Sequence, residues 1–383
     1  MKRNGLEKLI DEAKTHEFYC RLNFNGNSIE EFPVMTKKEL FSKIEKLIEN
    51  KTLLNTYWSP SGGTTSNDYI FMFPSDFTQN KTQRKLFVNQ LVQQKILSNE
   101  TVALNLFFGT GLYRSREIFN DFVEMVSGTV FPGGYTLSDS DAFYISKKFK
   151  VNTIMGYPSR LIKFAKYCQE NKLELEIQNF IYGAEKLDVQ KEKYVREVFK
   201  IKNIIGCYGS SESGVWAWTN GLNIYQYDTS MIYVEILDQD EDKIGSLVVS
   251  NLIRTKYPLI RYETGDLVFP IEEGKFQLVS RKSNSFQIAG SYFSLDNLEK
   301  EFNDSVVEYQ IVLTVEKESM TDIIQFKIVS NDEKKNIETE KTLEQIFGYL
   351  KNLLILKIDF VEIKDLKKSK NAEKVIKVVD LRY

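Results

Sequence analysis

A short run of serine, glycine and threonine, Ser61-Gly62-Gly63-Thr64-Thr65, has residue types that suit the binding of a phosphate. Adjacent glycines let backbone N–H groups turn toward an anion, and the hydroxyl groups add further donors. The run follows Leu53–Trp58, which we expect to form a short strand. It is not the phosphate loop of kinases and GTPases, because no Gly-Lys-Ser or Gly-Lys-Thr follows. A polyphosphate site is therefore one interpretation, and a flexible polar turn is the other.

A second segment, Tyr208-Gly209-Ser210-Ser211-Glu212, places a carboxylate beside hydroxyl groups. It follows Ile201–Cys207, which we expect to be a strand, and α/β proteins bind ligands in loops at the carboxyl ends of parallel strands. A carboxylate in such a loop could hold Mg²⁺ together with a phosphate. The alternative is a turn whose serine or glutamate caps a following helix.

A carboxylate and a lysine farther along the chain suit a sugar hydroxyl and a reacting phosphate. Asp266, in Thr264-Gly265-Asp266, could accept hydrogen bonds from sugar hydroxyls, although glycine and aspartate are also usual in β-turns. Lys374 could neutralise the negative charge that develops during attack on phosphorus. Lysines are frequent in this segment, so a solvated surface lysine is the alternative for Lys374.

Aromatic residues and glycines follow another expected strand, in Phe107-Phe108-Gly109-Thr110-Gly111-Leu112-Tyr113. A planar organic substrate could stack on such rings, whereas most aromatic side chains belong to a protein core. We assign Phe107, Phe108, Gly109 and Tyr113 to a substrate pocket. Gly156-Tyr157, which follows the expected strand Val151–Met155, is assigned to the same pocket.

The composition excludes several classes of function. The 383 residues are 42% hydrophobic and 27% charged, which is usual for a globular chain of two or three domains. A net charge of −2 argues against broad nucleic-acid binding, which needs a basic surface. No apolar run reaches the roughly 18 residues of a membrane span. The first residues lack an apolar signal-peptide core, so we expect a cytoplasmic protein without membrane or nucleic-acid partners.

Histidine and cysteine narrow the chemistry further. The single histidine, His16, rules out zinc sites built on several histidines and disfavours Ser-His-Asp catalysis. The three cysteines, Cys20, Cys168 and Cys207, are far apart and form no CxxC pattern or disulfide framework. The chemistry must therefore rest on charge, positioning and a metal ion.

The elements that position these residues alternate between strands and helices. Residues 1–57 favour helices, and residues 58–280 alternate apolar strand-like runs with helical ones, which is typical of α/β layers with parallel strands. Met231–Leu237 and Ser246–Leu252 are strand-rich without long helices between them. They predict a small β-barrel or antiparallel subdomain within the same large unit.

The last hundred or so residues predict a separate, small α+β domain. Tyr309–Val315 and Ile323–Val329 are expected to be paired strands, Ile337–Leu354 a helix and Lys357–Ile363 another strand. A polar stretch that starts at Arg281 marks the boundary. We therefore expect a large N-terminal domain of residues 1–280 and a C-terminal domain of residues 281–383.

The order and spacing of these segments resemble the adenylate-forming superfamily of acyl- and aryl-CoA synthetases, luciferases and peptide-synthetase adenylation domains. The resemblance covers nearly the whole chain, and the most similar branch looks like phenylacetate–CoA ligase and its shorter relatives. Besides the segments above, it rests on Phe32–Leu40, which is similar to the branch's Pro-x-x-x-Lys segment, and on Tyr182-Gly183-Ala184-Glu185, which is similar to its Gly-Ala-Glu element.

The resemblance implies a role for each motif. Gly183, Ala184 and Glu185 would lie against adenine, and Asp266 and Arg281 would hold the ribose. In Tyr208–Glu212, Ser211 would meet the α-phosphate and Glu212 would hold Mg²⁺, while Ser61–Thr65 would form the phosphate loop. Lys374 would match the lysine of the adenylation step.

A reaction follows from the same resemblance. A carboxylic acid, preferably an aryl acid, attacks the α-phosphate of ATP and pyrophosphate leaves, while Mg²⁺ and Lys374 offset the negative charge. The small C-terminal domain would then rotate and open a path for the thiol of coenzyme A or of the phosphopantetheine arm of an acyl or aryl carrier protein.

The chain also departs from the family's pattern. Ser66-Asn67-Asp68 stands where the family has Gly-x-Pro, Ser280 and Ser283 replace a glycine and an aspartate at the hinge, and Glu373 replaces the glycine before the lysine. These departures keep two alternatives open. The acyl-adenylate could pass to an amine or a partner protein, or the chain could be a non-catalytic nucleotide-binding relative.

Overall fold

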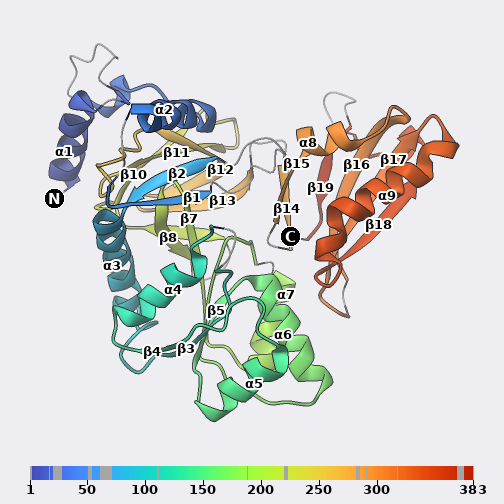
Figure 1. The fold of residues 1–383 in the computed structure, drawn as a ribbon, viewed down its shortest axis with the longest axis horizontal. Coiled ribbons are helices and arrows are strands. Elements are labelled where there is room, and N and C mark those ends of the chain that lie inside the picture. Colours follow the sequence, from blue (N-terminus) through green and yellow to red (C-terminus); the bar gives the residue numbers. More distant parts are fainter. Residues whose placement is uncertain are drawn as a thin grey trace.

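The computed structural model describes residues 2–16, 18–19, 28–50, 54–60, 71–109, 112–187, 189–219, 223–281, 285–289, 291–316, 318–368 and 375–382. Figure 1 shows one large sheet with helices packed around it, and a smaller sheet to one side. Within the described ranges, no helix combines the length and the apolar character that a membrane crossing requires.

The large sheet has 11 strands, and one half of it is parallel. Strands β3, β5, β6 and β7 run side by side in that order, with β4 at the outer edge. All four residues of β5 and all five of β6 are buried, as expected for parallel strands that are covered on both faces. The parallel strands predicted from the sequence are confirmed. They are β3 (Val102–Asn105), β5 (Thr153–Gly156), β6 (Asn179–Gly183) and β7 (Asn203–Ser210), while β4 (Thr129–Phe131) was not predicted.

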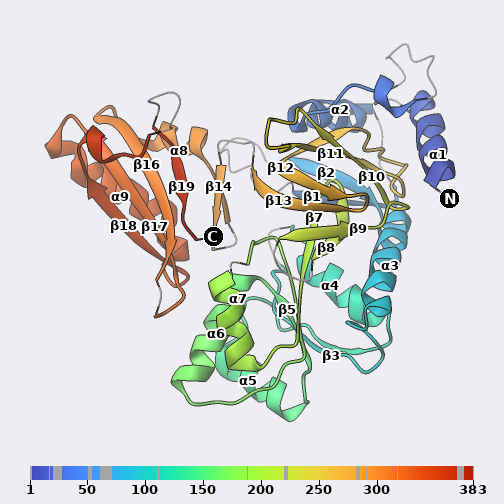
Figure 2. The same cartoon turned by 180° about the vertical axis from the view of Figure 1, so that it is seen from behind.

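Helices lie on both faces of this parallel half (Figures 1 and 2). Their buried residues enter two apolar clusters, one on each side, and Phe87 and Phe164 are among the fully buried side chains. Asp76 starts the first helix by accepting hydrogen bonds from the backbone N–H groups of Thr78 and Gln79. The helices are α3 (Phe77–Gln93), α4 (Ser115–Glu124), α5 (Asp139–Lys148), α6 (Pro158–Glu170) and α7 (Val189–Phe199).

The other half of the large sheet is antiparallel, and this corrects one prediction. The expected small β-barrel is not a separate unit here, because β8 pairs with β7 and so continues the same sheet. The antiparallel pairing predicted around residues 231–252 is confirmed by β10 and β11. The strands are β8 (Gly214–Thr219), β9 (Ile224–Tyr227), β10 (Ile232–Leu237), β11 (Gly245–Asn251), β12 (Tyr262–Glu272) and β13 (Lys275–Arg281).

The N-terminal segment packs against the antiparallel half. Helices α1 (Lys2–Thr15) and α2 (Lys37–Asn50) confirm the helical prediction for this region. Thr36 and Glu39 exchange side-chain and backbone hydrogen bonds at the start of α2, which is a capping box. A two-stranded sheet follows, made of β1 (Thr56–Pro60) and β2 (Met72–Asp76), with Pro60 paired to Met72.

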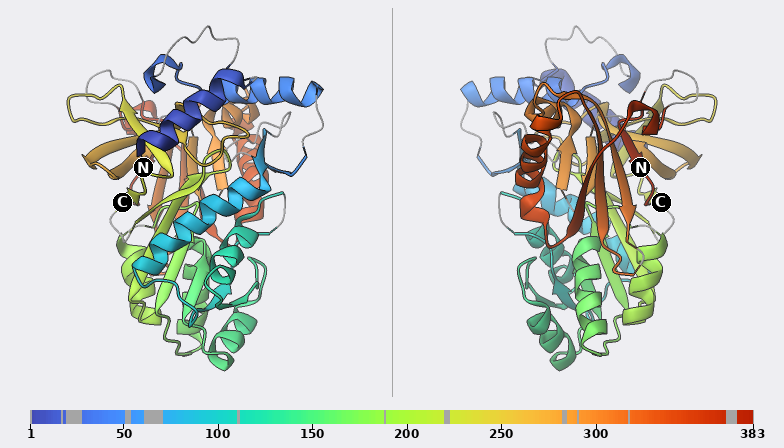
Figure 3. Two further views of the ribbon diagram at one scale, coloured as in Figure 1. Left: turned by 90° about the vertical axis from the view of Figure 1, so that its left-hand side faces the viewer. Right: turned by 90° about the vertical axis from the view of Figure 1, so that its right-hand side faces the viewer.

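The C-terminal residues form a four-stranded sheet with its own apolar core. The strand order is β18-β17-β16-β19, and α9 covers one face of this sheet (Figure 3). Phe293, Phe326 and Phe347 meet in that core. The elements are β14 (Ser285–Ile288), β15 (Ser291–Ser294), α8 (Leu295–Glu301), β16 (Val306–Val315), β17 (Asp322–Ser330), α9 (Asn336–Phe347), β18 (Leu354–Phe360) and β19 (Val378–Asp380).

The helix predicted over Ile337–Leu354 is too long. Helix α9 ends at Phe347 and a 3-10 turn over Gly348–Leu350 follows, after which Leu354 pairs with Asp322 in the sheet. The apolar pattern continues past the end of the helix, because the leucines after it face the same core. The pattern therefore did not show where helix α9 ends and β18 begins. The domain boundary at residue 281 stays a prediction, since residues 282–284 lie outside the described ranges.

Candidate functional site

Tyr208 and Asp266, two residues predicted to bind the nucleotide, are in direct contact. The Tyr208 hydroxyl donates a hydrogen bond of 2.5 Å to Asp266 Oδ2. Their strands are not neighbours, because β13, β9 and β8 stand between β12 and β7 in the sheet. The antiparallel half must therefore curl to bring them together. Asp266 also pairs with Arg281 in the β12–β13 register, so three predicted residues share one region.

Aromatic rings fill the inside of this curl. Trp216 and Phe276 are both 0% exposed, and their ring centroids lie 5.2 Å and 5.7 Å from that of Tyr208. Such edge-to-face contacts fix the direction of the Tyr208 ring. The carboxylate of Asp266 is thereby held at a defined place at the rim of the sheet.

The turn that carries Ser211 and Glu212 is held by buried polar side chains. The backbone carbonyl of Ser213 accepts hydrogen bonds from Gln83 Nε2 at 2.9 Å and from Asn251 Nδ2 at 2.8 Å. Both amide side chains are buried and bond to each other. This arrangement fixes a turn that has little regular structure of its own, and Glu212, only 2% exposed, is fixed with it.

Arg254 supports the same turn, although no motif in the sequence points to this residue. Its guanidinium Nη1 lies 3.4 Å from the Ser211 carbonyl oxygen and 3.3 Å from that of Glu212. Gly214 makes room for it, since an added Cβ would lie 2.3 Å from Arg254 Nη2. Burial, together with repulsion by Arg84, lowers the pKa of Arg254 to about 9, and Glu212 opposes the shift.

The predicted phosphate loop begins beside this turn. Ser211 Oγ donates a hydrogen bond of 2.7 Å to the carbonyl of Pro60, the last residue of β1. Ser61, Gly62, Gly63, Thr64 and Thr65 themselves lie outside the described ranges. Strand β1 ends at Pro60, which is bonded to Ser211, and β2 begins at Met72, which is directly paired with Pro60. Phosphate binding by these residues stays a prediction.

The Gly183-Ala184-Glu185 element lies at the end of β6, and the carboxylate of Glu185 accepts hydrogen bonds at the start of helix α6. Both Glu185 oxygens accept hydrogen bonds from Ser159, one from its backbone N–H at 2.8 Å and one from its hydroxyl at 2.7 Å. Tyr157, the N-cap residue of α6, offers no side-chain bond, so Glu185 satisfies the helix end instead. Burial raises the pKa of Glu185 to about 7 although the bonds from Ser159 lower it. Ala184 has a left-handed backbone with φ 65°.

The aromatic residues assigned to the acid pocket separate into core and rim. Phe107 is 1% exposed and stacks on Phe119 with centroids 4.0 Å apart, so it belongs to the core. Phe108 is 36% exposed and stacks on Tyr135 at 4.3 Å, and Tyr157 packs within 6.2 Å of both. Phe108 and Tyr135 therefore form the rim, and Tyr157 packs beneath them as a buried residue that also contacts Phe107.

Tyr135 was missed in the sequence because it stands alone after Pro132-Gly133-Gly134. Its hydroxyl is buried and has no hydrogen-bond partner among the described residues. Burial raises the pKa of Tyr135 well above its usual range. Arg160 holds the loop that presents it, by donating to the carbonyl of Tyr135 at 3.2 Å and of Leu137 at 2.8 Å.

The other assigned pocket residues have less direct places. Gly109 leaves space for the side chain of Arg116, since a Cβ added at Gly109 would lie 2.5 Å from Arg116 Nε. Gly156 lets β5 pack closely against Leu106, since a Cβ added at Gly156 would lie 3.3 Å from the Cβ of Leu106. Tyr113 is 45% exposed and near Tyr157, whose pKa burial raises to about 12.

Lys374 lies outside the described ranges, in residues 369–374. The segment is closed by a bridge between Lys368 and Val375 on the C-terminal unit. Its role in adenylation stays a prediction.

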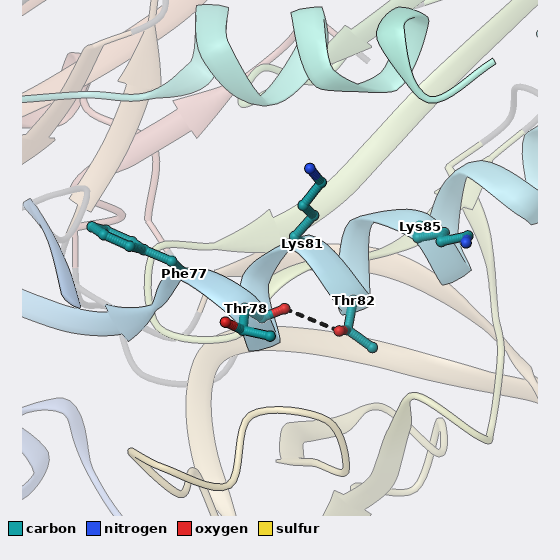
Figure 4. A pocket seen from close by; sticks show the side chains of 5 residues that line it. All are labelled: Phe77, Thr78, Lys81, Thr82 and Lys85. Atoms are coloured by element: carbon teal, nitrogen blue, oxygen red, sulfur yellow. Dashed lines mark hydrogen bonds between the residues drawn. The ribbon is translucent and has the colours of Figure 1, made fainter. Parts of the chain in front are cut away.

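A separate surface hollow of about 350 Å³ lies along α3 and does not coincide with these residues. Figure 4 shows that Phe77, Thr78, Lys81, Thr82 and Lys85 line it from one helix, and that Thr82 Oγ1 is bonded to the Thr78 carbonyl. No element faces them from the other side in this lining, so the hollow is an open helix surface.

No model of a known protein family matches the chain. Two known proteins are similar to it in sequence. Indoleacetate–lysine synthetase of Pseudomonas savastanoi is 24% identical over 328 residues, which cover 80% of this chain and 78% of that protein. Protein CapK of Staphylococcus aureus is 21% identical over 268 residues, 67% of this chain and 59% of CapK.

The fold is shared with solved structures of 2-hydroxyisobutyryl-CoA ligase. The structure in complex with 2-HIB-AMP and CoA in the thioesterification state has a TM-score of 0.71 at 18% identity, with 100% of this chain and 89% of that chain covered. The same ligase in the postadenylation state with R3-HIB-AMP has a TM-score of 0.63 at 17% identity, with 99% and 88% covered.

These likenesses do not single out the phenylacetate–CoA ligase branch, which stays a prediction. They agree on what is common to the relatives in sequence and in fold. The chain has the fold of 2-hydroxyisobutyryl-CoA ligase and is similar in sequence to indoleacetate–lysine synthetase.

Proposed function

We propose that the protein joins a small carboxylic acid to AMP at the expense of ATP and then transfers the acyl group to an acceptor. The observation that carries this proposal is the meeting of Tyr208 with Asp266 beside the turn that bonds Ser211 to Pro60. A fixed carboxylate that suits a sugar and a fixed turn that suits phosphates support this proposal.

The chain's own residues perform most of the first step by positioning and charge. Asp266 and Arg281 hold the ribose, and Gly183 and Ala184 offer backbone to adenine. A substrate carboxylate oxygen attacks the α-phosphorus of ATP, and the bond from that phosphorus to the bridging oxygen breaks. Pyrophosphate takes the electron pair and leaves. Lys374 offsets the negative charge at phosphorus.

Mg²⁺ fits the residues of the turn. A hard cation prefers oxygen ligands, and Mg²⁺ is usually bound by one or two carboxylates together with substrate phosphates. Glu212 supplies a buried carboxylate beside the hydroxyl of Ser211. No group of three or more metal-binding side chains gathers within the described ranges, so the phosphates would have to complete the coordination. The ion would supply charge neutralisation at the phosphates.

A planar aromatic acid is the substrate that the rim favours. Phe108, Tyr135 and Tyr157 pack together as a cluster of rings beside the end of β5, and such a cluster suits a flat apolar group. The unpartnered hydroxyl of Tyr135 adds one polar contact, so an aryl acid with a hydrogen-bonding ring substituent would gain most.

Two classes of acceptor have support of different kinds. A thiol, from coenzyme A or from the phosphopantetheine of a carrier protein, is supported by the fold shared with 2-hydroxyisobutyryl-CoA ligase. An amine is supported by the sequence likeness to indoleacetate–lysine synthetase. In both cases the acceptor attacks the acyl carbon, and AMP leaves with the electron pair.

The test is exchange of labelled pyrophosphate into ATP in the presence of Mg²⁺ with a panel of aryl, fatty and amino acids. We expect exchange with one acid class, and a loss of about 10²–10³-fold in Lys374→Ala and in Glu212→Gln. Lys370→Ala, which removes the same charge from the same segment, serves as the matched control and should keep its activity. ATP binding without exchange for every acid would instead favour the non-catalytic alternative.

The acceptor is tested separately with the acid that supports exchange. Coenzyme A and free lysine are added in parallel, and the acyl products are separated by mass. A thioester at a rate near that of exchange would contradict the amine acceptor, and an amide would contradict the thiol.

A further inference from the structure

The turn between β16 and β17 is where the C-terminal unit reaches the helices of the main body (Figure 2). Met320, in a left-handed backbone with φ 50°, packs its side chain against the apolar cluster that lies under α6 and α7. The residues after it, Thr321 and Asp322, face the same two helices. An adjoining cavity of about 270 Å³ shows that the surrounding contact is incomplete.

Two lysines of the main body bind this turn. Lys191 of α7 forms an ion pair with Asp322, and the two side chains are only 7% and 8% exposed. Lys166 Nζ of α6 donates a hydrogen bond of 2.5 Å to Thr321 Oγ1. Both lysines point from the parallel half of the sheet toward one short turn of the C-terminal unit.

A second contact joins the units at β14, and Arg382 links it to the first. Gln287 donates a hydrogen bond to the carbonyl of Ala184, next to the adenine element. Arg382 donates from Nη2 to the Gln287 carbonyl at 2.9 Å, while its Nη1 lies 3.8 Å from Asp322 Oδ2. Asp322 therefore stands at the centre of the bonds that fix the orientation of the C-terminal unit.

A buried ion pair such as Lys191–Asp322 affects the orientation of the C-terminal unit more than the overall stability of the protein. Two buried charges that separate together regain water, so their net contribution to stability is small. Removal of one partner leaves the other buried without a counter-charge, which is strongly unfavourable. A change in either residue should therefore shift the unit away from this orientation while leaving both cores intact.

The orientation has a counterpart in the compared ligase. Its two structures contain the same ligase in two named states, and their TM-scores with this chain are 0.71 in the thioesterification state and 0.63 in the postadenylation state. This chain is more similar to the thioesterification state. We propose that Lys191 and Asp322 are positioning residues for the acyl-transfer step, because they hold the C-terminal unit in the arrangement used for transfer. The proposal rests on the proposed function for its second half-reaction.

The orientation itself can be measured without substrate. Spin labels on Glu197→Cys of α7 and Ile337→Cys of α9, whose native side chains are 66% and 62% exposed, report the distance between the units by pulsed electron paramagnetic resonance. Cys168 and Cys207 are buried, and Cys20 is replaced by serine. We expect one dominant distance in the full-length protein.

In Asp322→Asn and in Lys191→Met, the ratio of molecules with the dominant distance to molecules with any other distance should fall about tenfold. This corresponds to about 1.4 kcal/mol. Because the two residues act as one pair, the double variant should shift it no further than the larger single change. Lys193→Met, on the same helix with a side chain 77% exposed, is the matched control and should leave the distance unchanged.

An unchanged distance in Asp322→Asn would overturn the proposal. If that variant fails to fold, Thr321→Val, which removes the bond from Lys166 together with the local bonds to Ser319, carries the same test. With an acid that supports pyrophosphate exchange, Asp322→Asn should keep exchange within about threefold while transfer to the acceptor falls about tenfold. Loss of both in equal measure would also overturn it. Absence of exchange with every acid would count against the proposed function alone, since the distance measurement needs no turnover.

Discussion

At the scale of single residues, the site depends on groups that are fixed by neighbours far away in the chain. Tyr208 holds Asp266, Ser211 holds Pro60, and Ser159 holds Glu185. In each pair, one or two hydrogen bonds help to fix where a polar group points. The effect of a substitution should therefore appear in binding before it appears in folding.

Tyr208→Phe removes the hydroxyl and keeps the ring. A hydrogen bond to a charged group contributes about 1.5–3 kcal/mol, so the loosened Asp266 should raise KM for ATP about tenfold with little change in kcat for exchange. Steady-state exchange at several ATP concentrations measures this. Tyr144→Phe, a change at a tyrosine 56% exposed on α5, should have no effect. An unchanged KM in Tyr208→Phe would show that Asp266 is positioned without the tyrosine.

Glu185 should make stability depend on pH. Its folded pKa, about 7, lies above the ordinary 4.5, so the folded protein binds this proton more tightly than the unfolded chain. The contribution of Glu185 to stability is therefore fully present below about pH 4.5 and is lost as the pH rises through about 7, by at most about 3 kcal/mol. Urea unfolding of Glu185→Gln and of the natural protein at pH 5 and pH 8 tests this. The difference between the two proteins should depend on pH in that direction, and equal pH dependence would refute it.

At the scale of elements, the turns are more decisive than the strands they join. The turn after β7 accepts a left-handed Gly214, with φ 71°, and the guanidinium of Arg254 occupies the space where a side chain would stand. Sequence patterns predicted β5, β6 and β7 because buried parallel strands are continuous apolar runs. They could not predict the contact between Tyr208 and Asp266, which depends on the curl of several strands, nor Arg254 and Tyr135, which lack any local motif.

Gly214→Ala should damage the turn through both its backbone and the contact with Arg254. A left-handed non-glycine residue costs about 1–2 kcal/mol, and displacement of Arg254 adds to it. We expect a lower melting temperature and a loss of exchange of at least about tenfold. Gly348→Ala is the matched control, because an added Cβ there meets nothing within 4 Å. Equal melting temperatures for the two variants would contradict this account of the turn.

At the scale of the whole molecule, the large sheet and the small sheet have separate apolar cores. The clusters around the large sheet and the cluster of the small sheet contain different side chains, and Met320 of the C-terminal unit packs against a cluster of the large sheet. The sequence could predict this division from the change in strand and helix spacing. It could not predict the orientation of the two sheets, because that depends on a few bonds such as Lys191–Asp322.

Residues 1–281 alone should fold and bind AMP with an affinity within about tenfold of that of the full chain. Exchange should fall by at least about 10²-fold, because Lys374 is then missing. Isothermal titration with AMP, beside the exchange assay, measures both. Full exchange by the shortened chain would show that Lys374 is not the adenylation lysine.

The curl around Tyr208 has a practical consequence. Trp216 is fully buried with its ring against that of Tyr208, and Trp58 stands two residues before Pro60, so two of the three tryptophans lie beside the proposed nucleotide position. The emission of an indole depends on the polarity and the movement of the groups that touch it. The protein therefore carries its own optical reporter, and its natural fluorescence offers a label-free way to follow the arrival and departure of nucleotide in real time.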